Sequence, residues 1–335
     1  MAATIKDVAK EAGVSVGTVS RYLNGQQLKS ANMDAVKNAI EKLNYKENLI
    51  AKGMKNNITK SVGVVINTLT DVFASSIVTA IESVLEANNY SLVICDYQQD
   101  VEKLQRKLKF LKSRNVDAII VFHVEKNLEV LDDFRNDGIP ILAIDCPIKD
   151  GCNDTIIVDN RNASYDILQY LYDYHHKDIG IIAGNQERYT GIQRFKGCLS
   201  FYEDHQMKMN EQYVYYGNYQ IIDGYQATNY FLSLNPRPTA IYATNYYMTI
   251  GAIQALNEKG LKIPEDISLV GFDYLDIFDV FNHDITMVEQ PLDEIGKKAA
   301  HMILERIWEK KGNANPKFVT IPTKIHHGNS IAKKK

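Results

Sequence analysis

From Ser61 onward, short apolar runs alternate with stretches whose apolar residues recur at helical spacing. The first series of apolar runs, each typical of a buried strand, covers residues 61–67, 91–96, 117–122 and 139–145. Helical patterns separate these runs at residues 75–88, 101–114 and 127–136. A second series follows at residues 155–159, 178–184, 239–244 and 267–273. This alternation predicts an α/β fold with two lobes, each built on a parallel sheet with helices on both faces. Ligands of such sheets gather beyond the carboxyl ends of the strands.

The first two dozen residues have the pattern of two short helices joined by a tight turn. One buried face of the first helix comes from apolar residues at i, i+3, i+4 and i+7: Ile5, Val8, Ala9 and Ala12. Thr4 stands where it can cap this helix, Gly13 where a helix ends, and Ser15 where it can cap the next. Val19 and Leu23 then point back to the same small core.

The second helix leaves small, polar and basic side chains on its outer face: Val16, Gly17, Thr18, Ser20, Arg21 and Asn24. In a helix-turn-helix, small residues at this end let the second helix approach the bases and phosphates of the major groove. A third helix is expected at residues 33–43, with Ser30 as its candidate cap. The periodicity alone also fits an amphipathic hairpin without a DNA role.

The charge distribution favours a nucleic-acid role for the first segment only. Residues 1–60 hold ten Lys and Arg against five Asp and Glu, a net charge of +5, whereas the whole chain carries −3. The remainder therefore carries −8, and only the first segment has the electrostatics to bind phosphates. The basic stretch KIHHGNSIAKKK, residues 324–335, is expected to be frayed.

Several other classes of protein are disfavoured. The four cysteines, Cys95, Cys146, Cys152 and Cys198, have no metal-site spacing and are interpreted as reduced thiols of a cytoplasmic protein. The sequence shows no secretory signal and no apolar run near the roughly twenty residues of a membrane span. Phosphate-binding glycine motifs, nucleophile elbows and zinc-binding helices are missing, so we expect no enzyme, no cofactor and no metal.

The segment DVAKEAGVSVGTVSRYLNG, residues 7–25, resembles the N-terminal signature of the LacI/GalR family of bacterial transcription regulators. The resemblance implies a repressor that binds double-stranded operator DNA as a homodimer and is controlled by a small effector. It implies an all-α helix-turn-helix head (1–46), a hinge helix (47–60) and a core like the periplasmic binding proteins (61–335). The chain would cross between the lobes of that core three times. One lobe would then comprise 61–158 and 289–320, and the other 159–288 and 321–330.

The resemblance also implies which residues contact DNA. These are Thr4, Ser15, Val16, Gly17, Thr18, Ser20, Arg21, Asn24, Tyr45, Asn48, Lys52 and Met54. Met54 would wedge into the minor groove, and Tyr45 and Asn48 would contact phosphates. Glu47, where the family has a proline, and Gly53, inside the hinge helix, depart from the family pattern and predict a hinge that depends more on DNA for its order.

Effector contacts are expected at the strand ends. Polar residues end or follow strands of the second series at Asp159, Arg194, Asn245 and Asp273, although Asp and Asn in such places can equally cap helices. The resemblance extends the set to Phe73, Asp159, Arg188, Thr190, Arg194, Tyr219, Asn245 and Asp273. Carboxylates, a guanidinium and aromatic faces suit a sugar.

Further aromatic residues near the expected cleft refine this interpretation. Tyr246 and Tyr274 stand where relatives have small polar residues, and together with Phe73 and Tyr219 they predict an extended or glycosidic sugar. The alternative is that these tyrosines lie on the dimer face or the solvent face. His123 is a further candidate with an open role. The alternative effector is a purine or another non-sugar metabolite.

Overall fold

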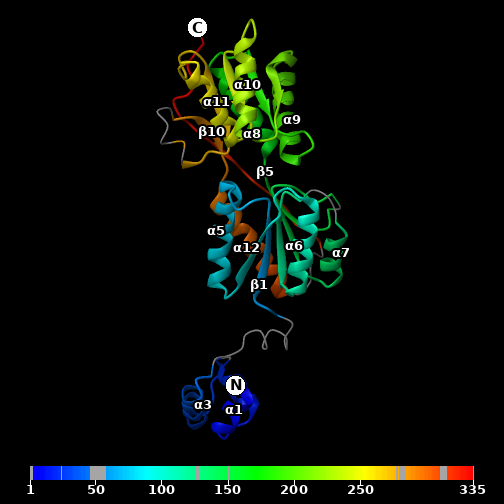
Figure 1. Ribbon diagram of the computed structural model, residues 1–335, viewed down its shortest axis with the longest axis vertical. Helices are drawn as coiled ribbons and strands as arrows, with labels where there is room; N and C mark the ends of the chain where they lie inside the picture. Colours follow the sequence, from blue (N-terminus) through cyan, green and yellow to red (C-terminus); the bar gives the residue numbers. More distant parts are fainter. Residues whose placement is uncertain are drawn as a thin grey trace. The chain divides into compact units, whose positions relative to one another are not determined.

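The computed structural model describes residues 3–23, 25–45, 58–124, 128–149, 151–276, 278, 284–309 and 315–334. It divides into two compact units, Met1–Thr59 and Lys60–Lys335 (Figure 1). We call the first unit the head and the second the core, and describe each by itself.

The head packs three helices around a small apolar centre. They are α1 (Ile5–Glu11), α2 (Val16–Leu23) and α3 (Ser30–Lys42). Their shared core consists of Val8, Ala9, Val19, Val36 and Ala39. Two predicted caps are confirmed, because Thr4 and Asp7 form a reciprocal capping box and the Ser15 hydroxyl accepts from Thr18 N at 3.1 Å.

Two predictions about the head are wrong. Thr18 does not face outward: it is 8% exposed, and its hydroxyl lies 2.9 Å from Ser15 Oγ, because it stands one turn after that cap. Ser30 does not cap α3 but is its first residue, and Lys29 at the cap position makes no side-chain cap bond.

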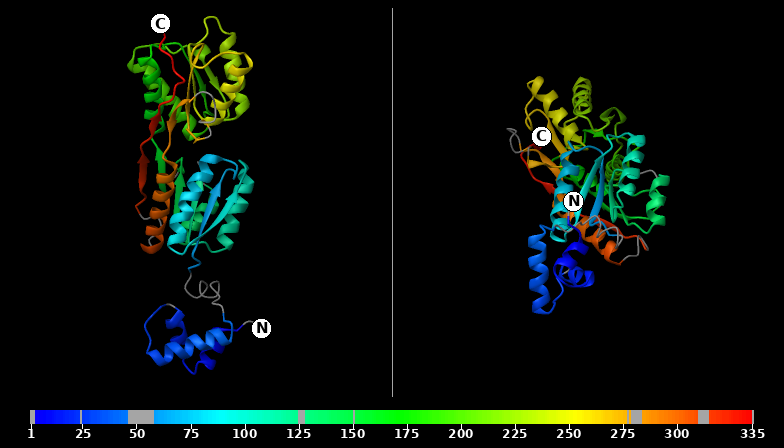
Figure 2. Two further views of the ribbon diagram at one scale, coloured as in Figure 1. Left: turned by 90° about the vertical axis from the view of Figure 1, so that its left-hand side faces the viewer. Right: turned by 60° about the horizontal axis from the view of Figure 1, so that its bottom comes forward.

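The first lobe of the core, lobe 1, is built on a fully parallel sheet. Its strand order is β11-β5-β4-β3-β1-β2. The strands are β1 (Ser61–Ile66), β2 (Ser91–Asp96), β3 (Ala118–Phe122), β4 (Ile141–Ile144), β5 (Asp154–Val158) and β11 (Phe318–Ile321). Its helices are α5 (Val72–Ala87), α6 (Val101–Ser113), α7 (Glu129–Asn136) and α12 (Leu292–Glu309). One face of the sheet packs against α5 and α12 and the other against α6 and α7 (Figure 2).

Lobe 2 repeats this layering. Its strand order is β12-β10-β9-β8-β6-β7, parallel except for β12 against β10. The strands are β6 (Ile179–Ala183), β7 (Val214–Tyr216), β8 (Ala240–Ala243), β9 (Ser268–Phe272), β10 (Thr286–Glu289) and β12 (Lys324–His326). A 3-10 turn, η1 (Glu211–Tyr213), precedes β7. The helices α8 (Asn160–Asp173) and α9 (Tyr189–Asp204) cover one face, and α10 (Ile221–Ser233) and α11 (Tyr246–Glu258) cover the other.

The chain passes between the lobes three times. It leaves lobe 1 after β5 to form α8, returns after β10 to form α12, and leaves again between β11 and β12. The carboxyl ends of the strands in both sheets therefore border the region between the lobes, which is where the α/β pattern predicts a ligand.

The segment after β12 packs onto lobe 2, contrary to the expected fraying. Ser330 is fully buried, its hydroxyl donates to Leu269 O at 2.6 Å, and the same oxygen accepts from Thr286 N at 2.9 Å. Lys334 N donates to Tyr174 O at 3.0 Å. Backbone groups of this segment thus find partners on lobe 2, which gives it order despite its basic composition.

Candidate functional site

A cavity of about 390 Å³ lies between the two lobes of the core. Aromatic residues line part of it: Phe73, Tyr97, Tyr219, Tyr246 and Tyr247. The other described lining residues are all polar or charged, and none is aliphatic. Such a surface offers hydrogen bonds in many directions together with flat apolar faces.

Seven of the eight expected effector residues line this cavity. They are Phe73, Arg188, Thr190, Arg194, Tyr219, Asn245 and Asp273. Asp159 does not line it, because its carboxylate caps α8, accepting from Asn162 N at 3.1 Å and from Asn162 Nδ2 at 2.7 Å. For this residue the capping alternative is correct.

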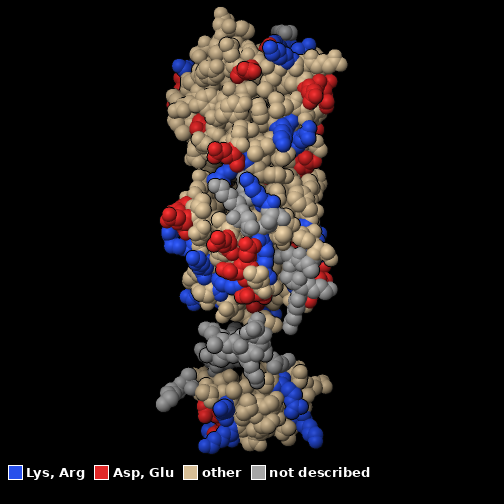
Figure 3. Space-filling model, turned by 90° about the vertical axis from the view of Figure 1, so that its right-hand side faces the viewer, with Lys and Arg blue, Asp and Glu red and all other residues tan. Residues whose placement is uncertain are grey.

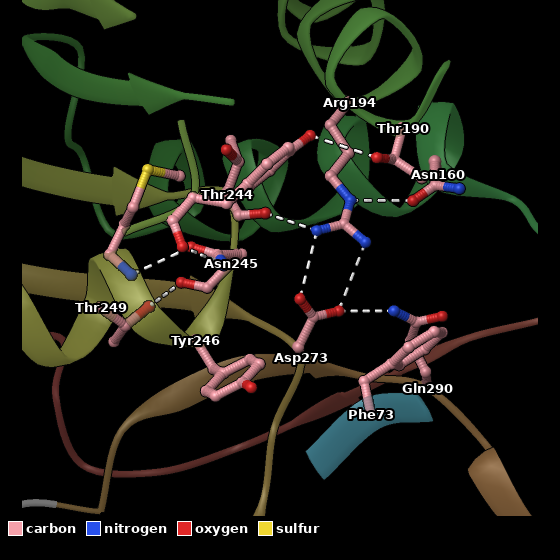
Figure 4. Close-up of polar contacts among 12 residues, drawn as sticks. Phe73, Asn160, Thr190, Arg194, Thr244, Asn245, Tyr246, Thr249, Asp273 and Gln290 are labelled. Atoms are coloured by element: carbon pink, nitrogen blue, oxygen red, sulfur yellow. Dashed lines mark hydrogen bonds and ion pairs between the residues drawn. The ribbon is translucent and has the colours of Figure 1, made fainter. Parts of the chain in front are cut away.

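Arg194 is the centre of a buried polar network (Figure 4). Its side chain enters from α9 and is 4% exposed. The guanidinium stacks on the Phe272 ring, with Cζ 3.6 Å from the ring centroid. It donates to Asn160 Oδ1 at 2.8 Å, to Thr244 O at 2.5 Å, and to both carboxylate oxygens of Asp273 at 3.3 Å. Within the described part of the chain, these bonds use four of the five guanidinium N–H groups and leave one without a partner.

Asp273 joins Arg194 to the crossover that leads into α12. Gln290 Nε2 donates to Asp273 Oδ1 at 2.5 Å. Burial raises the pKa of Asp273, while Arg194 and Gln290 act in the opposite direction. This pairing holds the carboxylate in place at the edge of the cavity.

Two helix starts also present polar groups here. The Asn245 side chain caps α11 by accepting from Met248 N at 2.9 Å. At the start of α9, Thr190 Oγ1 lies 3.2 Å from the Tyr219 hydroxyl. A Cβ at Gly184 would meet the Tyr219 ring at 2.2 Å, so only glycine lets this ring lie against the backbone.

The lobe 1 side of the cavity carries an ion pair. His123 and Asp145 follow the neighbouring strands β3 and β4, and His123 Nδ1 lies 3.0 Å from Asp145 Oδ2. Burial lowers the pKa of His123, but the carboxylates of Asp145 and Asp71 together outweigh burial and raise it. The Phe73 ring lies 6.2 Å from the imidazole, between centroids.

Backbone conformation marks the same region. Five non-glycine residues at the cavity have positive φ: Gln99 at 59°, His123 at 55°, Asp145 at 72°, Tyr219 at 64° and Asp273 at 69°. This conformation is uncommon for residues with a side chain and concentrates at functional sites. Here it places five potential ligand-binding groups around one cavity.

Sequence reasoning missed Asn67, Asp71, Asp145 and Gln290, which all line the cavity. Asn67 and Asp145 follow the apolar runs of β1 and β4, so the strand-end rule could have found them had it been applied to the first series. His123, whose role was open, does line the cavity. Tyr274 does not line the cavity. Its ring stacks on the His326 ring with 3.8 Å between the centroids, and His326 lies on the edge strand β12 of lobe 2.

The head presents a candidate DNA-binding surface at the start of α2. Val16, Gly17 and Arg21 are exposed and Ser20 is half-buried there, whereas Thr18 is buried. Thr4 and Ser15 act as caps, and Tyr45 packs against the head core. Among the charged side chains of the head in the face that Figure 3 shows, Lys and Arg cover more surface than Asp and Glu do. Asn24, Asn48, Lys52 and Met54 lie outside the described residues.

No helix among the described residues is both long and apolar enough to span a membrane. The described part of the chain also holds no group of three or more His, Cys, Asp or Glu side chains placed to bind a metal ion.

Two family models match this sequence. Residues 4–48 match the bacterial regulatory proteins of the lacI family, and residues 59–330 match the periplasmic binding proteins and sugar binding domain of the LacI family. The chain belongs to the LacI family. The resemblance of residues 7–25 and the predicted fold class are thereby confirmed, and the chain is a DNA-binding transcription regulator.

Curated and solved members of the LacI family resemble the chain along most of its length. The HTH-type transcriptional repressor PurR of Pasteurella multocida is 35% identical over 310 residues, which cover 92% of this chain and 93% of that protein. The Lac repressor dimer, solved bound to operator and the anti-inducer ONPF, shares the fold with a TM-score of 0.87 at 24% identity, covering 99% and 100% of the two chains. The regulator CelR, solved with cellobiose, has a TM-score of 0.74 at 25% identity, covering 98% and 99%.

Proposed function

We propose that this regulator is a repressor whose operator binding is controlled by a sugar or sugar derivative held in the cavity between the lobes. The observation that carries the proposal is the cavity lining, which combines carboxylates, amides and guanidinium groups with aromatic rings and has no aliphatic side chain among its described residues. A sugar has hydroxyls around its ring and flat C–H faces, and these match such a lining.

Each group has a role in this proposal. The carboxylates of Asp145 and Asp273 accept hydrogen bonds from sugar hydroxyls, and Arg188 together with the remaining N–H of Arg194 donates to sugar oxygens. Phe73 and Tyr219 offer faces for the apolar side of a sugar ring. Thr190 and Asn245 also line the cavity, and we propose them as further effector contacts. Asp159 does not line the cavity and is not proposed as an effector contact.

The domain plan links the cavity to DNA. We propose the helix-turn-helix head at 1–46, the hinge at 47–60 and the core at 61–335, with the regulator acting in the cytoplasm as a homodimer and without catalysis. Two heads of a dimer would read a roughly palindromic operator. An effector that binds the DNA-competent and the DNA-free arrangements unequally shifts operator affinity, typically by about 1 to 3 kcal/mol.

A purine is the second candidate effector. It is favoured by the relatives named PurR, one of which is 35% identical to this chain. The aromatic rings of Phe73 and Tyr219 could stack on a base. The sugar remains our first choice because a flat base would leave many of the polar lining groups without partners.

Thermal unfolding of the full-length protein tests this proposal. Mono- and disaccharides, including cellobiose and ribose, and purine bases, including hypoxanthine and guanine, are compared at several concentrations. A ligand that binds only the folded state raises the unfolding midpoint by mass action. A rise with a sugar that is lost in Asp273→Asn supports the proposal, and a rise with purines alone refutes it.

A further inference from the structure

Two side-chain oxygens that line the cavity accept no hydrogen bond from the described part of the protein. They are Asn67 Oδ1 and Gln290 Oε1, and both are buried. Gln290 is 5% exposed, and its Nε2 donates to Asp273, so the orientation of its amide is fixed and the group without a partner is the oxygen. Buried acceptors of this kind require a donor.

The charged groups of the cavity largely neutralise one another. Arg194 is bound by Asp273, and His123 is paired with Asp145. The Asp71 carboxylate accepts from Phe73 N at 3.1 Å and from the Tyr246 hydroxyl at 3.2 Å. Among the described lining residues, Arg188 is the cation that forms no ion pair with a carboxylate, and the lining holds three carboxylates in total.

Two of the helix N-termini at the cavity are already capped. Asp71 caps α5 and Asn245 caps α11 through their side chains, so the backbone N–H groups of Phe73 and Met248 are not available to an anion. The start of α9 has no side-chain cap at Arg188. A hydroxyl or carbonyl oxygen of an uncharged ligand can accept hydrogen bonds from the N–H groups at that helix start.

We propose that the effector is uncharged and donates hydrogen bonds to Asn67 and Gln290, and that the cavity excludes phosphorylated sugars and nucleotides. This inference rests on the proposed function of the cavity as the effector site. A phosphate group offers mainly acceptors and brings a charge of about −1.5 to −2. Inside the cavity it would add its charge to a lining in which the cations Arg194 and His123 are already paired with carboxylates and Arg188 alone is left to balance it. A low dielectric strengthens the repulsion between the phosphate and the carboxylates.

The test measures unfolding midpoints of the full-length protein with matched ligand pairs. The pairs are glucose with glucose phosphate, ribose with ribose phosphate, and inosine with inosine monophosphate, and hypoxanthine and cellobiose are each added alone. Inorganic phosphate is compared with chloride at equal ionic strength. We expect at least one uncharged member to raise the midpoint, its phosphorylated form to bind at least tenfold more weakly, and phosphate alone to have no effect.

The outcomes separate this inference from the proposed function. A rise with hypoxanthine but with no sugar refutes the sugar proposal and leaves the inference standing. A phosphate ester that stabilises the protein more than its parent, and loses that effect in Arg188→Ala, overturns the inference while the cavity remains the effector site. A panel in which no uncharged member raises the midpoint also counts against the inference.

Variants at Asn67 test the donor requirement directly. Asn67→Asp keeps an acceptor at this position, and we expect it to retain binding of the uncharged ligand found in the panel. Asn67→Leu removes the acceptor and is expected to weaken that binding at least tenfold. Asn257→Leu, at an exposed position of α11, is the matched control. If Asn67→Leu binds the uncharged ligand as tightly as the wild type does, the proposed hydrogen bond from the ligand to Asn67 is overturned.

Discussion

The Tyr246 hydroxyl of lobe 2 donates a hydrogen bond across the cavity to Asp71 Oδ1 of lobe 1, at 3.2 Å. The two residues stand at the first turns of α11 and α5, and both line the cavity. Burial, reinforced by the Asp71 charge, raises the pKa of Tyr246, so its hydroxyl stays protonated and remains a donor. This hydrogen bond couples the positions of two helices that belong to different sheets.

Replacing Tyr246 with Phe is expected to loosen the start of α5. The variant loses one hydrogen bond to a carboxylate, which typically contributes about 1.5 to 3 kcal/mol and less at a half-exposed acceptor. We expect faster amide hydrogen exchange in the first turn of α5. Tyr242→Phe is the control, because its hydroxyl lies 2.8 Å from Ser164 Oγ within lobe 2. Similar exchange at α5 in both variants would contradict the coupling.

Replacing Arg194 with Met is expected to destabilise the core by about 3 to 5 kcal/mol, because it leaves the Asp273 carboxylate buried without its cation. Urea unfolding followed by circular dichroism measures this loss. Arg161→Lys, at an exposed site whose guanidinium donates to Ser200, should change stability by less than about 0.5 kcal/mol. The double variant with Asp273→Leu should recover part of the loss, and strict additivity of the two changes argues against the pairing.

Replacing Arg21 with Ala is expected to weaken DNA binding through the loss of one phosphate contact. Arg21 is exposed on α2, and its Nε lies 3.4 Å from Gly17 O. Fluorescence anisotropy with a random-sequence duplex should show a salt dependence whose slope falls by about 1. Arg114→Ala, at an exposed site in lobe 1, should leave the slope unchanged. An Arg21→Ala slope equal to that of the wild type would sink this assignment.

The buried His176 is expected to make the core less stable at acidic pH. Its Nδ1 lies 2.9 Å from Thr239 Oγ1 and its Nε2 lies 2.9 Å from Ala332 O. Burial lowers the pKa of His176 below its ordinary value of 6.5, so the unfolded chain takes up the proton first as the pH falls. The contribution of neutral His176 to the stability of the core is fully present above the ordinary pKa of 6.5. It is lost as the pH falls from there through the lowered pKa of His176 in the folded protein.

Unfolding free energies between about pH 8 and pH 5 check this sign, since ordinary histidines titrate within this range. The wild type should lose more stability toward low pH than His176→Gln does, so the difference between the two proteins shrinks on acidification. His301→Gln, at an exposed position of α12, is the control. A difference that is constant with pH would show that His176 is not responsible.

The layered sheets followed from the sequence because strand and helix periodicities differ so clearly. The apolar runs at 61–67, 91–96 and 117–122 became β1, β2 and β3, and the helical pattern at 101–114 became α6. Short edge strands escaped prediction. β7 and β11 have three and four residues and are partly exposed, so neither an apolar run nor a clean alternation marks them.

The cavity residues show where sequence reasoning ends. Asp145 and Asp159 both follow apolar strand runs, yet only Asp145 reaches the cavity. Asp145 has a φ of 72° and turns its carboxylate toward His123, whereas Asp159 has a φ of −76° and caps the helix that follows it. Backbone conformation separates the two roles, and residue type alone does not encode it.

The passage between β11 and β12 has a consequence for how the core is made during translation. β11 completes the lobe 1 sheet beside β5, and β12 completes the lobe 2 sheet beside β10, so each sheet receives an edge strand from residues 318–326. Chains emerge from the ribosome in order, and domains generally fold as units. Both lobes must therefore wait, with an open sheet edge, for the same late stretch of polypeptide. During this interval the unpaired edges of β5 and β10 are open to pairing with other chains, and residues 318–326 close both of them.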